Sequence, residues 1–476
     1  MKNKALNFLI FITFVLFCYP LFLQKTFGEV SLEQVLFHLM NPLKGTNPKL
    51  YVKGIGYLFL LPLLLALLYR KTHLFLPRKW KNGVLKWENS RFQAVGIGVL
   101  FLGAVGLQLH VLKIGEWLDS HRHPTTIFRD YAVTQQIENI TFNQKKNAVV
   151  IYMESVESTY ADGSVFKKNY IPELTELANR ETSFDGFYQY PGTQWTIAGI
   201  FSGLCGLPLK IPMKGMRLDL FKTFLPNAVC VPQVLQAKGY ETQMILGTNA
   251  EFSGMDNFAS QHGFNKYWGI HEIEREKGGL TKEMMGHGWG LNDEAVFEFA
   301  KEKIGQAAQA NKPFFFVIET MDTHFPNGFF NPKICQKSEN NMTDVIRCSS
   351  KQIRDLVDWI QAQPFGPDTA IILFGDHIAM SNDVIKELRK NPHRQVVNIF
   401  INGVQPPEFK KKREFGTFDF APTILAFLGG IVPGDAIGLG RNLFSETPTL
   451  TETMGTDTVK REIQKYSPEY QWFFGE

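Results

Sequence analysis

Three long apolar stretches near the N-terminus constrain this chain more than any other feature of its 476 residues. They cover residues 5–23, 51–69 and 92–112, and each is close to the roughly 20 residues that a helix needs to cross a bilayer. A cleaved signal peptide would explain the first stretch but not the second and third. The sequence therefore predicts a transmembrane region over residues 1–112 with three helical spans.

Basic residues around these stretches predict their orientation. Lys2 and Lys4 precede the first stretch, and the loop 70–91 carries seven Lys or Arg residues against one acid, Glu88. Loops rich in Lys and Arg stay on the cytoplasmic side of a membrane. We therefore expect a cytoplasmic N-terminus, a cytoplasmic loop 70–91, and a chain that lies outside from residue 113 onward.

The part of the chain after residue 112 is acidic, although the whole chain has a formal charge of +4. Residues 1–112 hold 13 of the 50 basic and 3 of the 46 acidic residues, which leaves 37 basic and 43 acidic residues and a net charge of −6 for the remainder. This balance gives no electrostatic reason to expect nucleic-acid binding.

Four of the five cysteines fall in the part predicted to be exported: Cys205, Cys230, Cys335 and Cys348. An even number of cysteines in an oxidising compartment favours two disulfides. The sequence permits three pairings, and free buried thiols are the alternative. We favour Cys335–Cys348, which closes a short polar loop, together with Cys205–Cys230.

Beyond residue 147, short apolar runs alternate with helical stretches. Predicted strands at 148–153, 243–246, 313–319, 370–374 and 396–401 are separated by predicted helices. This pattern is typical of a mainly parallel sheet sandwiched by helices. We therefore predict an α/β domain over 147–445, preceded by a linker, 113–146, and followed by a polar C-terminal tail, 446–476. An interfacial helix is predicted near 31–40, where apolar residues recur at helical spacing.

Residues that could bind a metal ion follow two of the predicted strands. Glu154 comes directly after one strand, and Asp376 and His377 come after another strand and a glycine, Gly375. Ligands collect at the carboxyl ends of strands in such sheets. Carboxylate and imidazole ligands suit Mn²⁺ or Zn²⁺ better than Ca²⁺. A hydrogen-bonded Asp–His pair and a helix-capping Glu154 are the structural alternatives.

A hydroxyl nucleophile is predicted beside this group. Thr196 follows the Pro191-Gly192 turn and opens a predicted helix, where free N–H groups and the positive end of the dipole can receive phosphate. Metal coordination would favour its alkoxide. An N-cap threonine is the structural alternative. Thr193 is the competing nucleophile, and Ser155 and Ser158 are weaker candidates.

A third predicted strand end carries Thr320 through His324. His324 is positioned to donate to a phosphate oxygen or to protonate a leaving alkoxide, with Asp322 to orient it. A satisfied surface histidine is the alternative. The glycine-rich stretch 286–290 has neither the lysine nor the spacing of a phosphate-binding loop, so it predicts a turn near the site.

Taken in order, four stretches resemble the membrane phosphoglycerol transferases that modify osmoregulated periplasmic glucans: 153–155, 192–199, 322–328 and 375–380. Those enzymes are related to lipoteichoic acid synthases and, more broadly, to sulfatases of the alkaline phosphatase superfamily. The resemblance extends to Val35–Leu39 and to Gly438–Arg441.

This resemblance implies an alkaline-phosphatase-like α/β domain in the periplasm of a bacterium, anchored in the inner membrane. It implies a divalent metal, Mn²⁺ before Mg²⁺ or Zn²⁺, with Glu154, Thr196, Asp376 and His377 as ligands. It selects Thr196 over Thr193 as the nucleophile that attacks phosphatidylglycerol and releases diacylglycerol. His324 would then bind substrate.

The stretch 247–256 departs from the pattern of lipoteichoic acid synthases, which hold the glycerophosphate with a Trp/Arg pair that is missing here. Asn249 and Asp256 are the substitutes that we assign to substrate binding, and Trp195 is assigned to substrate binding as well. The acceptor is expected to be a periplasmic glucan or a surface protein. Phosphoethanolamine transfer to lipid A or protein, a sulfatase-like hydrolase and a membrane-anchored scaffold are the alternatives.

Overall fold

The computed structural model describes residues 2–28, 30–40, 45–72, 89–211, 222–286, 288–310, 312–339, 341–406 and 408–475. The chain divides into two compact units. A helical unit comprises Met1–Leu32 and Asn47–Asp119, and an α/β unit comprises Glu33–Thr46 and Ser120–Glu476. The α/β unit is therefore discontinuous in sequence. Most of the predicted cytoplasmic loop, residues 73–88, lies outside the described residues.

The helical unit contains α1 (Lys2–Phe27), α3 (Pro48–Ile55), the π-helical turn η1 (Gly56–Leu60), α4 (Leu61–Thr72) and α5 (Asn89–Val111). Lys4–Phe27 and Pro48–Lys71 are each 24 residues long and apolar enough to cross a membrane. Val95–Val111 meets this test only with α6 (Ile114–Arg122), from which it is bent by 60°. The described residues thus hold two candidate spans, or three if the bent pair is one span.

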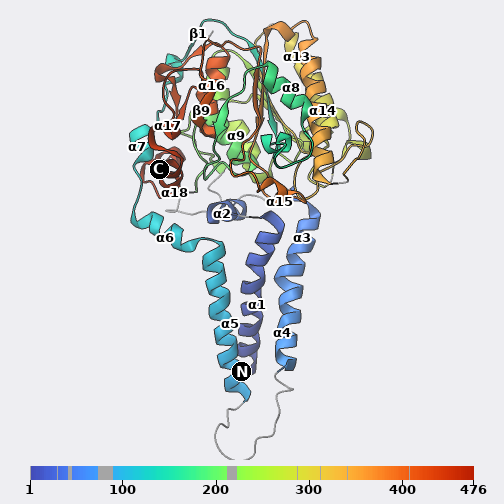
Figure 1. The fold of residues 1–476 in the computed structure, drawn as a ribbon, viewed down its shortest axis with the longest axis vertical. Coiled ribbons are helices and arrows are strands. Elements are labelled where there is room, and N and C mark those ends of the chain that lie inside the picture. The colour runs from blue at the N-terminus through green and yellow to red at the C-terminus, as the bar shows by residue number, and fades with distance from the viewer. Residues whose placement is uncertain are drawn as a thin grey trace, which may run out of the picture. The chain divides into compact units, whose positions relative to one another are not determined.

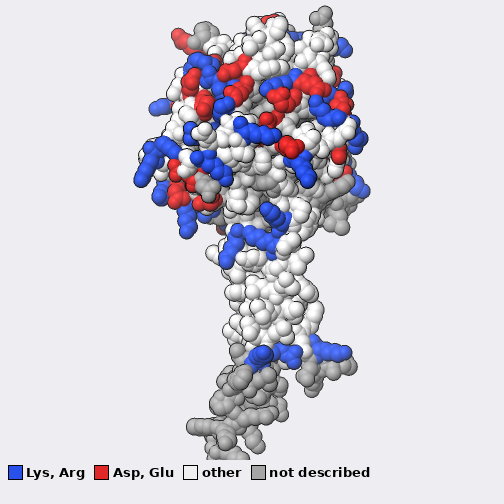
Figure 2. All heavy atoms as spheres, turned by 90° about the vertical axis from the view of Figure 1, so that its right-hand side faces the viewer, with Lys and Arg blue, Asp and Glu red and all other residues white. Residues whose placement is uncertain are grey.

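The surface of this helical unit suits an apolar environment. Figure 2 shows a band along it without Lys, Arg, Asp or Glu side chains. Helices satisfy their own backbone hydrogen bonds, which apolar surroundings require. A part-buried hydrogen bond joins α5 to α1, because the Gln108 amide donates to the Leu16 carbonyl at 2.8 Å.

A six-stranded sheet forms the centre of the α/β unit, in the order β5-β4-β6-β2-β7-β8. Its strands are β2 (Asn147–Met153), β4 (Glu241–Ile245), β5 (Lys266–Trp268), β6 (Phe314–Glu319), β7 (Thr369–Gly375) and β8 (Asn398–Ile401). All neighbouring pairs are parallel except β7 and β8. The prediction of a mainly parallel sheet is confirmed, with one antiparallel strand at its edge.

Helices cover both faces of this sheet (Figure 1). On one face pack α9 (Thr196–Cys205), α10 (Val231–Ala237), α11 (Met255–Gln261) and α16 (Phe420–Phe427). On the other face pack α8 (Pro172–Arg180), α12 (Ile270–Lys277), α13 (Asp293–Ala308), α14 (Met342–Gln361) and α15 (Ile385–Leu388). Alternate residues of β2, such as Val150 and Ile151, enter the two opposite cores. Each such side chain contributes about 1.5–3 kcal/mol when fully buried.

Most of the predicted linker, from Ser120 onward, and the whole predicted tail belong to this same α/β unit. Within 113–146, Ile127 and Phe128 of α7 (Ile127–Tyr131) are buried, and β1 (Thr141–Phe142) pairs with β10 (Gly430–Ile431). Within 446–476, α17 (Leu450–Met454), α18 (Thr456–Gln464) and the 3₁₀ helix η10 (Glu469–Phe474) add apolar residues to the core. The tail has a polar composition because only one side of these amphipathic helices is buried.

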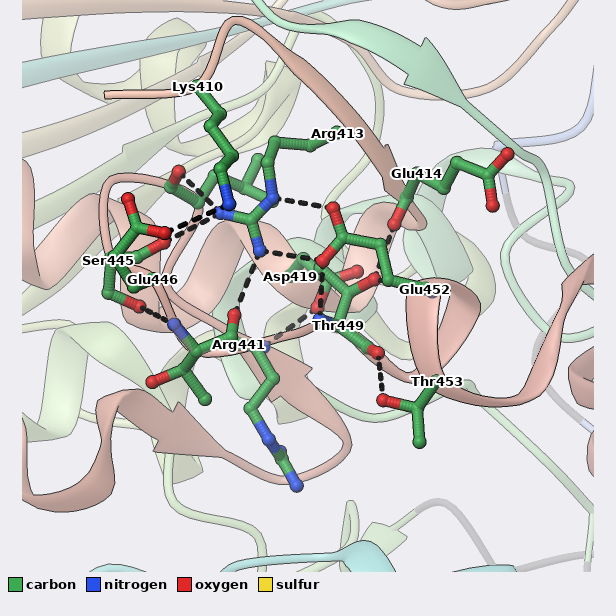
Figure 3. A network of polar contacts seen from close by, with 12 residues as sticks. Lys410, Arg413, Glu414, Asp419, Arg441, Ser445, Glu446, Thr449, Glu452 and Thr453 are labelled. Atoms are coloured by element: carbon green, nitrogen blue, oxygen red, sulfur yellow. Dashed lines mark hydrogen bonds and ion pairs between the residues drawn. The ribbon is translucent and has the colours of Figure 1, made fainter. Parts of the chain in front are cut away.

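A buried arginine of strand β9 (Lys412–Phe415) joins the C-terminal tail to the rest of the α/β unit (Figure 3). This residue, Arg413, donates from Nε to Glu452 Oε1 at 2.6 Å and from Nη2 to Glu452 Oε2 at 2.9 Å. Its Nη1 donates to the carbonyls of Leu443 and Ser445. This bidentate pair compensates a buried charge, so Arg413 depends on the tail for its partners.

Both predicted disulfides are present. Cys205 at the end of α9 bonds to Cys230 at the start of α10, and Cys335 bonds to Cys348 in α14. Cys18 is free and buried in α1. The first bridge ties together two helices of one layer, and the second closes a loop onto α14. Cross-links of this kind stabilise the fold mainly by restricting the unfolded chain.

Candidate active site

Three adjacent strands of the sheet, β6, β2 and β7, deliver the predicted site residues to one edge. Glu154 follows β2, the segment Thr320–His324 follows β6, and Asp376 and His377 follow β7. The register of β2 places Met153 opposite Gly375 of β7, so the two strands end together. The carboxyl edge of the central strands is where parallel sheets place ligands.

Glu154, Asp376 and His377 come together as predicted. Each offers one ligand atom, and these atoms lie within 4.8 Å of one another. His377 Nε2 is 3.8 Å from Glu154 Oε1 and 3.5 Å from Asp376 Oδ2. These separations leave room for one ion between the three ligand atoms rather than a direct hydrogen bond.

The hydrogen bonds around this group leave one buried oxygen available. Asp376 Oδ1 accepts from the backbone N–H groups of Ser155 at 2.8 Å and of His377 at 2.7 Å. Asp376 Oδ2 is buried and has no hydrogen-bond partner among the described residues. An unpartnered carboxylate oxygen in a protein interior is costly, and a cation would compensate it. The residues present therefore fit a divalent metal.

The tautomer of His377 follows from its surroundings. Its Nδ1 lies 3.0 Å from the carbonyl of Ile378, which can only accept, so Nδ1 carries the proton. In the neutral ring the lone pair is then on Nε2, the atom that faces the two carboxylates. A backbone carbonyl that fixes the ring in this way is a common arrangement behind a metal-binding histidine.

Burial and mutual repulsion set the charges in the group. Burial, and next the charge of Glu154, raise the pKa of Asp376 to about 7. Burial opposes ionisation of Glu154 as well, but His324, His377 and hydrogen bonds from Ser155 and Thr196 lower its pKa. Burial opposes protonation of His377, yet the two carboxylates raise its pKa. The site is thus electronegative and prepared for a cation.

Thr196 and Thr193 occupy different environments despite their similar sequence positions. Thr196 is partly exposed at the start of α9, and its hydroxyl donates to Glu154 Oε2 at 3.1 Å. Thr193 is fully buried, and its hydroxyl donates to the Tyr190 carbonyl at 2.8 Å. Of the two, only Thr196 has its hydroxyl on the candidate metal group. Ser155 is the other hydroxyl there, donating to Glu154 Oε1 at 2.6 Å.

The start of α9 lies against the backbone of the metal group. A Cβ atom on Gly199 would lie 2.2 Å from the carbonyl oxygen of Asp376, so only glycine permits this approach. The chain also turns sharply after Glu154, where Ser155 adopts a left-handed backbone conformation with φ of 55°. The close approach at Gly199 and the turn at Ser155 together bring the side chains of Thr196 and Glu154 within hydrogen-bonding distance.

His324 is buried beside the group. Its Nδ1 lies 3.0 Å from the Phe325 carbonyl and therefore carries the proton. Burial lowers the pKa of His324 more than the charge of Glu154 raises it. At neutral pH the ring is neutral, with Nε2 as an acceptor. This state favours a role as hydrogen-bond acceptor or base over the predicted donation of a proton to the leaving group.

Asp293, which the sequence analysis did not select, holds the loop that carries His324. Its Oδ1 accepts from the backbone N–H groups of Met321 at 2.6 Å and of Asp322 at 3.0 Å. Asp322 returns the contact by accepting from the N–H of Asp293 at 3.1 Å. The carboxylate of Asp322, which we expected to orient His324, also accepts from Gln352. An acid at the first turn of a predicted helix looks like an ordinary N-terminal residue, so the sequence carries little signal of this role.

The three residues assigned to substrate binding are placed differently. Trp195 is buried and directly precedes Thr196. Asn249 is buried, and its side chain accepts from the N–H of Glu251 at 3.0 Å, which forms a local turn. Asp256 is partly exposed in the first turn of α11, where burial raises its pKa. Trp195 thus adjoins Thr196, whereas the Asn249 side chain is engaged in a hydrogen bond of its own local turn.

The fold and this group of residues define a class. The model of the sulfatase family matches residues 146–431, and the chain belongs to that family. Among curated proteins, the chain is similar to phosphoglycerol transferase I of Salmonella choleraesuis (strain SC-B67), with 31% identity over 431 residues. The match covers 88% of this chain and 53% of the relative, so the chain spans about half the length of the curated relatives it matches.

Solved structures share the fold. The lipoteichoic acid synthase LtaP from Listeria monocytogenes has a TM-score of 0.52 at 17% identity, over 65% of this chain and 80% of that one. The integral membrane protein lipooligosaccharide phosphoethanolamine transferase A (EptA) from Neisseria meningitidis has a TM-score of 0.51 at 10% identity, over 97% and 88%. The predicted alkaline-phosphatase and sulfatase type of fold is thereby confirmed.

Proposed function

We propose that this protein transfers phosphoglycerol from phosphatidylglycerol to a hydroxyl group outside the cytoplasmic membrane. The contact that carries the proposal is the 3.1 Å hydrogen bond between Thr196 and Glu154, beside an unpartnered oxygen of Asp376. It pairs a nucleophile with a cation site. The similarity to phosphoglycerol transferase I supports the transferred group. The similarity to EptA concerns the fold alone and does not favour phosphoethanolamine.

Glu154, Asp376, His377 and Thr196 would hold the divalent metal, for which Mn²⁺ is our first choice and Mg²⁺ or Zn²⁺ the alternatives. When bound, such an ion neutralises phosphate charge and favours the alkoxide form of a coordinated hydroxyl. Carboxylate and imidazole ligands suit Mn²⁺.

The chain's own groups account for two balanced steps. In the first, Thr196 Oγ1 forms a bond to phosphorus, the bond from phosphorus to the diacylglycerol oxygen breaks, and the threonine proton ends on diacylglycerol. In the second, the oxygen of an acceptor hydroxyl forms a bond to phosphorus, the bond from phosphorus to Thr196 Oγ1 breaks, and the proton of the acceptor hydroxyl ends on Oγ1. The unprotonated Nε2 of His324 would take the proton of that hydroxyl and pass it on. A periplasmic glucan or a surface protein would supply the acceptor.

The proposed location is the inner membrane of a bacterium, with a cytoplasmic N-terminus and a periplasmic α/β unit. The apolar helices and the Lys/Arg distribution support this orientation. A reporter that fluoresces only in the cytosol, fused to the C-terminus, should stay dark. A bright fusion would reverse the orientation.

Intact mass spectrometry tests the reaction. Purified full-length protein, stripped of metal by a chelator and reloaded with Mn²⁺, is exposed to vesicles that contain phosphatidylglycerol. We expect diacylglycerol to be released and one glycerophosphate to be added to the peptide that contains Thr196. The chelated protein should show neither event. Addition from phosphatidylethanolamine instead would replace the proposal by phosphoethanolamine transfer.

A further inference from the structure

Helix α2 (Leu32–Met40) lies in the chain between α1 and α3 of the helical unit, yet from Glu33 onward it belongs to the α/β unit. Its Phe37 is 0% exposed, and the Phe37 ring lies 5.6 Å from the ring of Trp195. Its Gln34 contacts Met380, four residues beyond Asp376, through Nε2 and Sδ at 3.6 Å. The helix therefore touches two of the segments that build the site.

After α2, Gly45 lies close to a third segment, the loop 249–253. Gly45 has a φ of 92°, and a Cβ atom there would lie 2.8 Å from the Cβ of Asn249. His38 lies above the same loop, with its ring 6.1 Å from the ring of Phe252 in a stacked arrangement. Its Nδ1 is 3.5 Å from the hydroxyl of Ser253. His38 and Gly45 thus both lie against the loop 249–253.

Together with the residues of the site, these contacts form a closed series of neighbouring residues that starts and ends at Thr196. The hydroxyl of Thr196 donates a hydrogen bond to Glu154. The charge of Glu154 in turn acts to raise the pKa of His324. The ring of His324 is 4.2 Å from Trp289, Trp289 is 5.8 Å from Phe252, and Phe252 stacks on His38. His38 is 6.5 Å from Trp195, the residue that precedes Thr196. Within this series, His38 alone joins Phe252 to Trp195.

We propose that α2 is a wall of the active site and that His38 is a donor-binding residue, which contacts the glycerophosphate group of the lipid beside Thr196. The identity of that group rests on the proposed function. The wall itself rests on the contacts of α2. The match to the sulfatase family begins at residue 146 and does not include His38.

The chemistry of His38 suits the uncharged glycerol end of this headgroup. Among the described residues, its Nε2 has no hydrogen-bond partner, and the side chain is partly exposed. The surrounding rings exclude water and lower the pKa of His38 to about 4, so the imidazole is neutral at neutral pH. A neutral imidazole both donates and accepts, as a glycerol hydroxyl does.

Two measurements on the full-length protein in vesicles test this proposal. The first compares diacylglycerol release from phosphatidylglycerol by the wild type, His38→Ala, His38→Phe and Leu39→Ala. Leu39 is the matched control because it is the next residue on α2 and its side chain is 62% exposed. The second measures binding of sn-glycerol 1-phosphate and of phosphoethanolamine to the Mn²⁺-loaded protein, which needs no turnover.

We expect His38→Ala to raise the KM for phosphatidylglycerol about 10-fold, as loss of one buried polar contact does, with kcat changed less than about 3-fold. Binding of sn-glycerol 1-phosphate should weaken by a similar factor. His38→Phe, which keeps the stack on Phe252, should share the binding defect, and Leu39→Ala should match the wild type.

Unchanged KM and binding in His38→Ala would overturn the proposal, and so would a fall in kcat alone. Wild-type binding by His38→Phe would also overturn it, because this variant keeps the stack on Phe252 and lacks the proposed polar contact. A wild-type protein that binds phosphoethanolamine and not sn-glycerol 1-phosphate would refute the proposed function instead. In that case a weaker binding of phosphoethanolamine by His38→Ala would still support α2 as a wall.

Discussion

At the scale of single residues, environment decides which of two equivalent side chains can react. Thr193 and Thr196 are three residues apart and follow the same turn. The hydroxyl of Thr193 is committed to a backbone carbonyl in the core, whereas that of Thr196 reaches Glu154. Residue type and spacing left both open, and only the family resemblance chose between them.

Exchange of the two threonines for alanine separates these roles. Thr196→Ala should lower kcat for diacylglycerol release by about 10³-fold or more, because no other group replaces a covalent nucleophile. Thr193→Ala should lose about 1 kcal/mol of stability with its hydrogen bond and keep its activity. Steady-state kinetics and thermal unfolding of both variants give the comparison. Equal activity losses would remove Thr196 from its assigned role.

His262 illustrates a buried titratable residue outside the site. It is 0% exposed among Phe201, Phe224 and Phe258, and its Nε2 is 2.5 Å from the Phe224 carbonyl. Burial, against the effect of that carbonyl, lowers the pKa of His262 to about 4. The native state therefore keeps this ring neutral at pH values where the unfolded chain, with a pKa near 6.5, already binds a proton.

Stability should consequently fall as the pH drops from about 6.5 to about 4. In this window the unfolded state binds more protons than the native state, so the free energy of unfolding decreases, by at most about 3 kcal/mol for this one residue. Thermal unfolding midpoints of the wild type and His262→Gln in detergent, at pH 7.5 and 4.5, measure the effect. The variant should lose less of its midpoint on acidification. An identical acid shift in both proteins would contradict the assignment.

At the scale of elements, helix α9 shows how closely two backbones must approach to form the site. Thr196 opens this helix, and one turn later Gly199 faces the carbonyl of Asp376. The stretch Thr-Ile-Ala-Gly indicates a helix start in the sequence. That the helix rests on the loop after β7, more than 170 residues later, follows from packing alone.

Gly199→Ala should therefore separate α9 from Asp376. The added methyl group would meet the Asp376 carbonyl at 2.2 Å, which forces a backbone shift and costs about 1–3 kcal/mol. We expect a lower unfolding temperature and weaker binding of Mn²⁺ by titration calorimetry. Gly305→Ala is the matched control, since a Cβ atom there meets nothing within 4 Å in helix α13. It should stabilise the helix by about 0.5–1 kcal/mol. Wild-type metal affinity in Gly199→Ala would show that the approach is not required.

At the scale of the whole molecule, the α/β unit is assembled from segments at both ends of the chain. Helix α2 precedes the sheet by more than a hundred residues, and the C-terminal helices follow the last strand. Lys210, which is buried, donates to the carbonyl of Lys465 at 2.8 Å, and Tyr470 donates to that of Pro208 at 2.6 Å. These bonds attach the tail to the segment that follows α9.

Removal of residues 446–476 should accordingly destabilise the protein. Truncation strips Arg413 of Glu452 and Lys210 of its carbonyl partners, and it leaves apolar core residues exposed. Leaving the buried Arg413 guanidinium without its carboxylate partner costs up to about 3–5 kcal/mol, a large part of the stability of a typical domain. We expect the truncated chain to aggregate or to lose its cooperative thermal transition. A folded, active truncation product would instead support the predicted boundary at residue 445.

The sequence by itself determined the features that local patterns encode. Apolar stretches of membrane length, the strand and helix order from residue 147 onward, and the polar residues at the ends of β2, β6 and β7 are all readable from periodicity and composition. The parallel sheet then brings those strand ends to one edge, so Glu154, Asp376 and His377 were predictable as a group.

Tertiary structure alone decided which segments meet around that edge. The packing of α2 on Trp195, the support of the His324 loop by Asp293 and the docking of the tail on Arg413 each join residues far apart in the chain. The physical reason is that an amphipathic helix or a helix-starting acid has the same local pattern whatever surface it meets. Its partner is chosen by the shape and polarity of surfaces that exist only once the sheet and its helices have assembled.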